Sequence, residues 1–60
     1  MNESILVGDY VLVKYLDGRM ACGDVVSDDG ETVTVSIHGL ILDFREKGIA
    51  KRQCKLIHRF

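Results

Sequence analysis

The serine and cysteine side chains are the groups of this chain that could act as nucleophiles. They are Ser4, Ser27, Ser36, Cys22 and Cys54. A catalytic nucleophile needs a base within hydrogen-bonding reach and a third group that orients the base. The spacing of the sequence places no such base and acid beside any of them, and no glycine-rich phosphate loop opens a long helix. We therefore expect a protein that is not an enzyme and that needs neither a cofactor nor a small-molecule substrate.

Cysteine and histidine are also the side chains that most often bind zinc. The chain contains Cys22, Cys54, His38 and His58. The cysteines lie far apart and no C-x-x-C pair is present, whereas structural zinc sites typically take paired ligands at short spacing. We expect no metal site and interpret the cysteines as reduced structural thiols.

The beginning of the sequence gives no sign of export. The apolar residues 5–7 form a stretch that is too short and wrongly flanked for the core of a secretory signal. No run within the 60 residues is long enough to cross a bilayer. We expect a cytoplasmic protein with no membrane partner.

Charge is divided unequally along the chain. Residues 1–43 carry eight acids and two bases, a net charge of −6, whereas residues 44–60 carry six bases and one acid, a net charge of +5. The basic cluster of the second part consists of Lys51, Arg52, Lys55 and Arg59. Such side chains bind nucleic acid through its phosphates, so the cluster is a candidate for nucleic-acid contact. The acidity of the other residues opposes binding to a polyanion, and the two parts can instead neutralise each other within one fold.

A second class of candidate contact residues is apolar. Residues 40–42 form the run Leu-Ile-Leu, and the face of the first predicted strand opposite to its valines carries Tyr10, Leu12 and Leu16. Contiguous exposed apolar surface usually marks an interaction site, although scattered surface hydrophobic residues are common. The residues that we expect to bind a partner are Leu12, Tyr15, Ile41 and Phe44. The partner would be another protein or a second copy of the chain, unless residues 5–7 fold back and cover this surface.

Hydrophobic periodicity predicts the strands that position these residues. Val11, Val13 and Tyr15 share one face of the first strand, and residues 32–37 alternate between apolar and hydroxyl side chains. The expected strands cover residues 10–16, 19–27, 32–37, 40–44 with an extension as far as 49, and 54–58, and one helical or 3-10 turn covers residues 50–53.

Glycines mark the turns and one bend. Asp17-Gly18 is a dipeptide that two-residue type I′ hairpin turns prefer, and residues 28–31 and 38–39 supply two further turns. Gly23 lies inside a strand, where glycine typically marks a sharp bend or the close approach of another strand. Short strands separated by turns at this spacing favour a small barrel.

Two segments resemble parts of SH3-like barrels of the Tudor and KOW types. The segment GDYVLVKYLDGRMACGDVV, residues 8–26, is similar to their opening hairpin, and IAKRQCKLI, residues 49–57, is similar to their closing strands and 3-10 turn. The resemblance implies an all-β, five-stranded SH3-like barrel over residues 8–60, with residues 1–7 as a leader. It also implies a non-catalytic module that binds another macromolecule.

Tudor-like domains that bind methylated side chains use several aromatic rings. By the resemblance, the first ring would be Tyr15, but Ala21 stands where the second would fall, and Ile37 and His38 stand where further rings would help. We therefore expect no full aromatic cage. KOW-like modules contact nucleic acid through basic side chains, which makes the basic cluster the alternative to protein binding.

Overall fold

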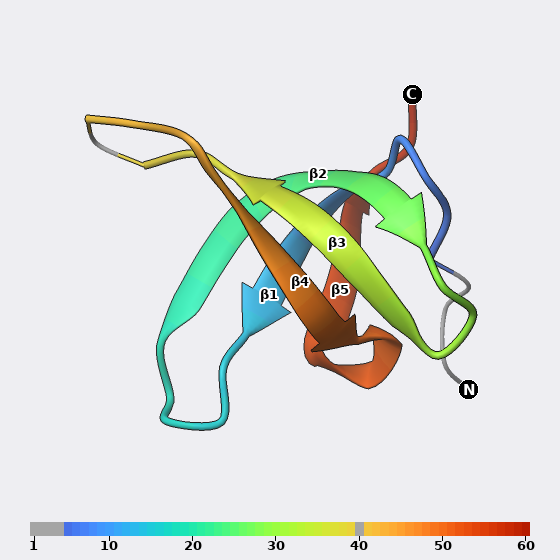
Figure 1. The fold of residues 1–60 in the computed structure, drawn as a ribbon, viewed down its shortest axis with the longest axis horizontal. Helices are drawn as coiled ribbons and strands as arrows, with labels where there is room; N and C mark the ends of the chain where they lie inside the picture. Colours follow the sequence, from blue (N-terminus) through green and yellow to red (C-terminus); the bar gives the residue numbers. More distant parts are fainter. Residues whose placement is uncertain (1–4, 40) are drawn as a thin grey trace.

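Five strands and one short 3-10 helix make up the fold, and the computed structural model describes residues 5–39 and 41–60. The elements are β1 (Tyr10–Lys14), β2 (Met20–Asp28), β3 (Thr32–Ile37), β4 (Phe44–Ala50), the 3-10 helix η1 (Lys51–Gln53) and β5 (Cys54–His58). The strands form one antiparallel sheet in the order β4-β3-β2-β1-β5 (Figure 1). The predicted all-β fold with a 3-10 turn before the last strand is confirmed. Within the described residues no ladder joins β4 to β5, so the sheet is open.

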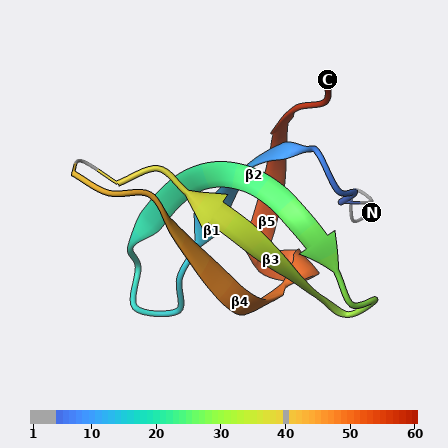
Figure 2. The same ribbon diagram turned by 45° about the horizontal axis from the view of Figure 1, so that its top comes forward.

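β2 is the strand that bends the sheet. It arches across the molecule and pairs with β1 through its first half and with β3 through its second half (Figure 1 and Figure 2). Gly23 lies where the two pairings overlap, opposite both Val11 and Ile37. A Cβ atom at Gly23 would lie 2.2 Å from the carbonyl oxygen of Ser36, so only glycine allows β3 to approach this closely. The predicted role of Gly23 is confirmed.

The core lies on the concave face of the bent sheet and consists of β-branched side chains, which suit a pleated surface. Its buried apolar residues are Ile5, Val11, Val13, Val25, Val33, Val35, Ile37 and Ile49. The faces predicted for β1 and β3 are confirmed, since their inward valines are fully buried. Ile5 is only 1 % exposed, so a residue of the expected leader contributes to the core. None of the described segments is a helix of the length and apolar character that a membrane span requires.

An ion pair between a buried carboxylate and a half-exposed guanidinium joins the segment before β1 to the segment after β5. Asp9 is 1 % exposed, and Arg59 donates from Nε to Oδ1 at 2.9 Å and from a terminal nitrogen to Oδ2 at 2.9 Å. The backbone N–H of Leu6 also donates to Oδ2 at 2.9 Å. The hydrogen bond from Arg59 lowers the pKa of Asp9 below its ordinary value, against the opposing effect of burial. A bidentate guanidinium is the partner that lets a carboxylate remain charged at such a buried position.

The turn between β1 and β2 differs from the prediction. The N–H of Tyr15 donates to the carbonyl oxygen of Arg19 at 2.8 Å, so the loop between them contains three residues. Gly18 has a φ of 95°, but Asp17 does not have a positive φ. A type I′ turn requires positive φ at both central residues, so the type I′ turn predicted for Asp17-Gly18 is wrong. Asp17 instead accepts a hydrogen bond from the backbone N–H of Arg19 at 3.0 Å, and Gly18 supplies the left-handed residue that three-residue loops need.

The fourth strand begins later than predicted. β4 starts at Phe44, so Ile41, Leu42 and Asp43 belong to the connection from β3, and the predicted start at residue 40 is wrong. Leu40 itself lies outside the described residues. A Cβ atom at Gly39 would collide with the carbonyl oxygen of Leu42. The backbone therefore folds back closely on itself here, where a regular strand pair would keep its two backbones farther apart.

Candidate protein-binding surface

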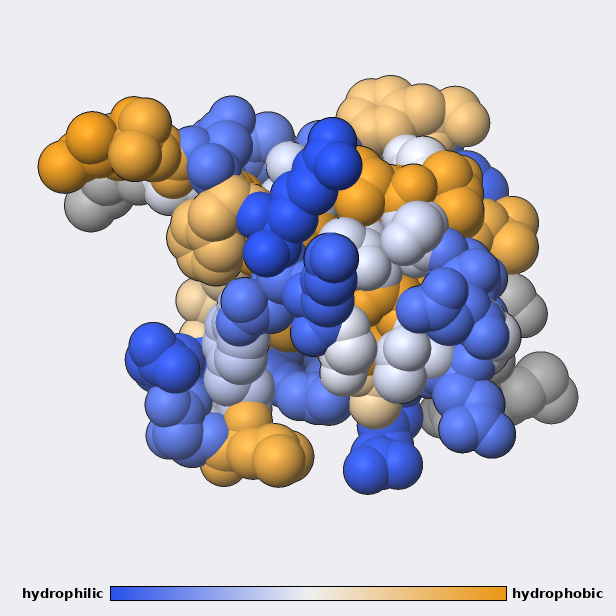
Figure 3. Space-filling model, viewed as in Figure 1, coloured by the Kyte–Doolittle hydropathy of each residue, from blue (hydrophilic) through white to orange (hydrophobic). Residues whose placement is uncertain are grey.

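The connection between β3 and β4 carries two exposed aliphatic side chains. Ile41 is 92 % exposed and Leu42 is 77 % exposed, and we call these two residues the hairpin tip. The β3–β4 hairpin extends beyond the body of the sheet, and hydrophobic side chains lie at its end (Figure 1 and Figure 3). Adjacent aliphatic side chains on a protruding hairpin expose apolar area that the core of the same chain does not cover.

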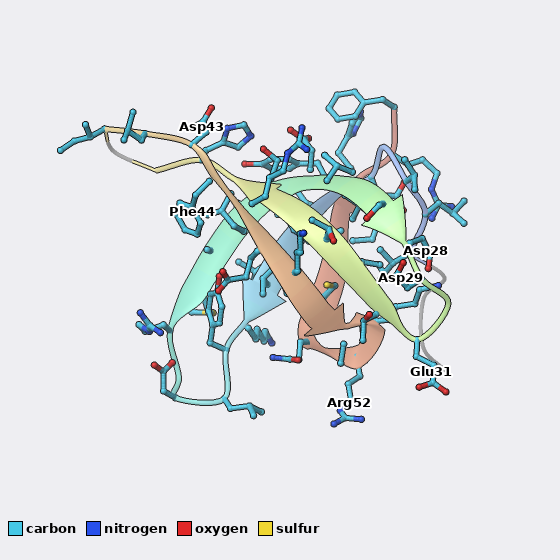
Figure 4. The ribbon with its side chains drawn as sticks, viewed as in Figure 1. Asp28, Asp29, Glu31, Asp43, Phe44 and Arg52 are labelled. Carbon is cyan, nitrogen blue, oxygen red and sulfur yellow. The ribbon has the colours of Figure 1, made fainter. Side chains whose placement is uncertain are left out.

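Phe44 lies at the base of this hairpin. It pairs with the buried Ile37 in the β3–β4 register, so its side chain belongs to the concave face, and it is 49 % exposed. Asp43 and Phe44 point to opposite sides of the strand (Figure 4). Asp43 Oδ1 lies 3.7 Å from Nδ1 of His38, and His38 Nε2 lies 3.2 Å from Oδ2 of Asp24. The base of the hairpin therefore has an aromatic side and an acidic side.

A shallow groove lies beside the β1–β2 loop, and we call it the loop groove. It has a volume of about 320 Å³ and is lined by Tyr15, Leu16, Asp17, Arg19 and Gln53. Gln53 fixes η1 against the end of β1, because its side-chain nitrogen donates to the carbonyl oxygen of Lys14 at 3.2 Å. Its side-chain oxygen accepts from the N–H of Ala50 at 3.2 Å. Leu16, by contrast, is 94 % exposed.

Arg19 is held at the loop groove by two neighbours. Its guanidinium carbon lies 5.4 Å from the centre of the Tyr15 ring, and its Nε donates to Asp17 Oδ2 at 2.7 Å. The backbone hydrogen bond from Arg19, followed by the side-chain one, lowers the pKa of Asp17. Burial raises the pKa of Tyr15, and the charge of Glu46 adds to that effect. These contacts hold the Arg19 side chain in place before any partner binds, although the side chain is 77 % exposed.

The residues expected to bind a partner do not all lie together. Tyr15 packs against the core and lines the loop groove, and Phe44 faces the same concave side. Ile41 lies farther out on the hairpin of Phe44. Leu12 is half-buried on the opposite face of β1, where its cross-strand neighbours are Cys22 and Lys55.

Leu16 and Leu42 are among the most exposed apolar residues of the described chain. The sequence pattern places both among the outward-facing apolar residues, although neither is one of the four residues expected to bind a partner. Leu16 precedes Asp17-Gly18 and lies in a tight turn, where polar residues are more frequent than aliphatic ones. An aliphatic side chain in such a turn has little chance of burial, which is a second reason to expect Leu16 at the surface. Leu42 belongs to the apolar run of residues 40–42, and the start of β4 at Phe44 places it in the connection rather than in a strand.

The four residues of the basic cluster have different surroundings. Lys51 Nζ donates to Asp28 Oδ2 at 2.9 Å, and Arg59 binds Asp9 as described above. The backbone hydrogen bond from Gly30, followed by that of Lys51, lowers the pKa of Asp28. Arg52 and Lys55 are exposed, and Arg52 lies at the end of the molecule away from Asp43 (Figure 4).

No set of three histidine, cysteine or acidic side chains within residues 5–39 and 41–60 is placed to hold a metal ion. Cys22 and Cys54 are free thiols, and burial raises the pKa of Cys54.

No family model, curated protein or solved structure matches this chain.

Proposed function

We propose that this chain is a non-catalytic module that binds another protein chain through the hairpin tip and the concave surface next to it. The observation that carries the proposal is the exposure of Ile41 and Leu42, at 92 % and 77 %. Burying one aliphatic side chain of this size stabilises a complex by about 1.5–3 kcal/mol. The tip would therefore contribute about 3–6 kcal/mol before the cost of association.

The scaffold that we infer for this module is an SH3-like barrel of the Tudor and KOW type. The strand order, the long bent β2 and the position of η1 directly before β5 support this inference. In such a scaffold the bent sheet would keep the β1–β2 loop and the β3–β4 hairpin at fixed places on its rim. Rigid display reduces the entropy lost when a partner binds.

A photoactivatable cross-linking residue at Leu42 tests the proposed function. The full chain would be produced in cells with this residue at position 42 or, as a control, at Glu31. Glu31 is also exposed but lies at the other end of the molecule from Phe44 (Figure 4). We expect protein adducts, including adducts to the chain itself, in much higher yield from position 42. Equal yields from both positions, or no protein adduct from position 42, would contradict the proposal.

Contact with nucleic acid is the second candidate, and the exposure of Arg52 and Lys55 favours it. Two phosphate contacts would give log Kobs a slope of about −1.8 against log salt concentration. Mobility shifts of mixed-sequence DNA and RNA at low salt would measure this slope. Binding that follows it and disappears in an Arg52→Glu, Lys55→Glu variant would support this function, and the absence of any shift at low salt would exclude it.

A further inference from the structure

We propose that the partner is a second copy of this chain, bound so that the hairpin tip of each copy enters the loop groove of the other. This inference rests on the proposed function, because it names the occupant of the same surface. It predicts a symmetric dimer in which both contacts form at once. Three features carry it: the fit of the tip to the groove, their relative positions, and the charges beside them.

The tip and the groove match in character. The groove is a shallow and open depression of about 320 Å³. Aliphatic side chains of a partner would therefore lie along it rather than inside an enclosed pocket. Its apolar lining comes from Tyr15 and Leu16, and the tip supplies Ile41 and Leu42. Contact would therefore cover three of the most exposed aliphatic side chains of the described residues, Leu16, Ile41 and Leu42.

The positions of the tip and the groove suit a two-fold axis. The β3–β4 hairpin projects to the left and the β1–β2 loop projects downward below it, so both lie on the left half of the molecule (Figure 1 and Figure 2). An axis perpendicular to the view of Figure 1, placed between the two projections, brings the tip of each copy next to the loop of the other. A two-fold interface uses the same patch on both copies. Phe44, which is 49 % exposed between the two projections, would lie near the axis.

Charged side chains lie beside both elements, and the groove has Arg19 together with the acids Asp17 and Glu46 beside it. Asp43 follows the tip directly, and its side chain is 65 % exposed. Arg19 lines the groove and donates through Nε to Asp17, while a guanidinium has further N–H donors to offer to a second carboxylate. Insertion of the tip would bring Asp43 of one copy towards Arg19 of the other. Apolar contact with charged groups at the rim is the usual arrangement of a protein interface.

Other occupants fit this surface less well. A lipid surface is disfavoured because Asp43 and Asp24 lie beside the hairpin, and the anionic lipids of cytoplasmic membranes repel such carboxylates. An unrelated protein would need its own complementary groove and cation, whereas this chain already carries both. The contact is small, so we expect a weak dimer with a dissociation constant on the order of 100 µM.

Sedimentation equilibrium of the full chain, from low micromolar to millimolar concentration, tests the inference. Leu42→Asp changes the tip and Leu16→Asp changes the groove. Both side chains are largely exposed, so each variant should keep its fold, which circular dichroism would verify. We expect each to weaken association at least about tenfold. The matched control is Phe60→Asp, which changes another exposed apolar residue, 86 % exposed, and should associate like the wild type.

A mixture of the Leu42→Asp and Leu16→Asp chains distinguishes reciprocal insertion from other dimers. Each variant alone has no intact tip–groove contact, but a mixed dimer retains one. We therefore expect the equimolar mixture to associate more strongly than either variant alone. If the wild-type chain is monomeric at millimolar concentration, the proposal that a second copy is the partner is wrong. In that case, cross-links from position 42 to a different protein would still support the proposed function. A mixture no stronger than its components, or a control as weak as the two variants, would overturn the reciprocal arrangement.

Discussion

Replacing Gly23 by alanine should destabilise the chain severely, because the added methyl group has no room. Its Cβ would lie 2.2 Å from the carbonyl oxygen of Ser36 and 2.9 Å from Cγ1 of Val35. Cβ atoms essentially never approach other atoms closer than 3.0 Å, so the Ser36 carbonyl must retreat from 2.2 to at least 3.0 Å, a movement of 0.8 Å. Neighbouring strands are only about 4.8 Å apart, and β3 would be pushed away from β2 by a sizeable part of that spacing.

The loss of stability from this substitution has two sources. Overpacking of a well-packed core costs about 1–3 kcal/mol, and each ladder hydrogen bond weakened beside Gly23 adds about 0.5–1.5 kcal/mol. A loss of about 3 kcal/mol is comparable to the whole stability of a domain of this length, roughly 3–9 kcal/mol. At about 4–8 °C for each kcal/mol in a small domain, the Tm should fall by about 12–24 °C.

Thermal unfolding followed by circular dichroism measures this effect, and Gly8→Ala is the matched control. Gly8 has a φ of 95°, but no atom lies within 4 Å of the Cβ position, so alanine there suffers only the strain of a left-handed backbone, about 1–2 kcal/mol. Both substitutions change the unfolded chain in the same way. A Gly23→Ala Tm equal to or above that of Gly8→Ala would refute the claim that the approach of β3 excludes a side chain.

Three further predictions concern the ends of the chain and its thiols. Ile5→Ala should lower the free energy of unfolding, measured in urea, by about 2–5 kcal/mol. The control Leu6→Ala, at a position 50 % exposed, should change it by less than about 0.5 kcal/mol. Equal effects of the two substitutions would mean that Ile5 is not part of the core. The stabilisation of the fold by the Asp9–Arg59 pair should be fully present above the ordinary carboxyl pKa of 3.8. It should be lost as pH falls through the lowered pKa of Asp9. The Tm difference between wild type and Asp9→Asn should therefore shrink with acid, and a constant difference would contradict this. Because burial raises its pKa, Cys54 should react slowly with a thiol reagent until the chain is unfolded, and rapid labelling of the folded chain would show that it is accessible.

Local patterns were sufficient to predict most of the secondary structure. Alternation in residues 32–37 identified β3 with its correct bounds, because a sheet with one buried face requires a period of two. Gly23 was recognisable because an interior strand glycine has few uses other than a bend or a close approach. The 3-10 turn before β5 was visible as a break between two strand patterns.

The features that depend on distant parts of the chain could not be predicted in this way. The partner of Asp9 is fifty residues away at Arg59, and no local pattern links them. The apolar run at residues 40–42 has the composition of a strand, but the fold places Ile41 and Leu42 beyond the end of the sheet. The candidate contact surface was therefore only partly predictable. Ile41 and Phe44 were among the expected contact residues, and Leu42 and Leu16 were among the outward-facing apolar residues, but how far each side chain is exposed depends on where the strands stop.

The distance between Asp9 and Arg59 in the sequence also affects how the chain can fold during synthesis. At about 5–20 residues per second, Asp9 is synthesised several seconds before Arg59, and β1 is likewise synthesised well before its partner strand β5. Until then, an inward-facing carboxylate without its guanidinium opposes closure of the valine core. The native core can therefore close fully only after β5 and Arg59 have been synthesised.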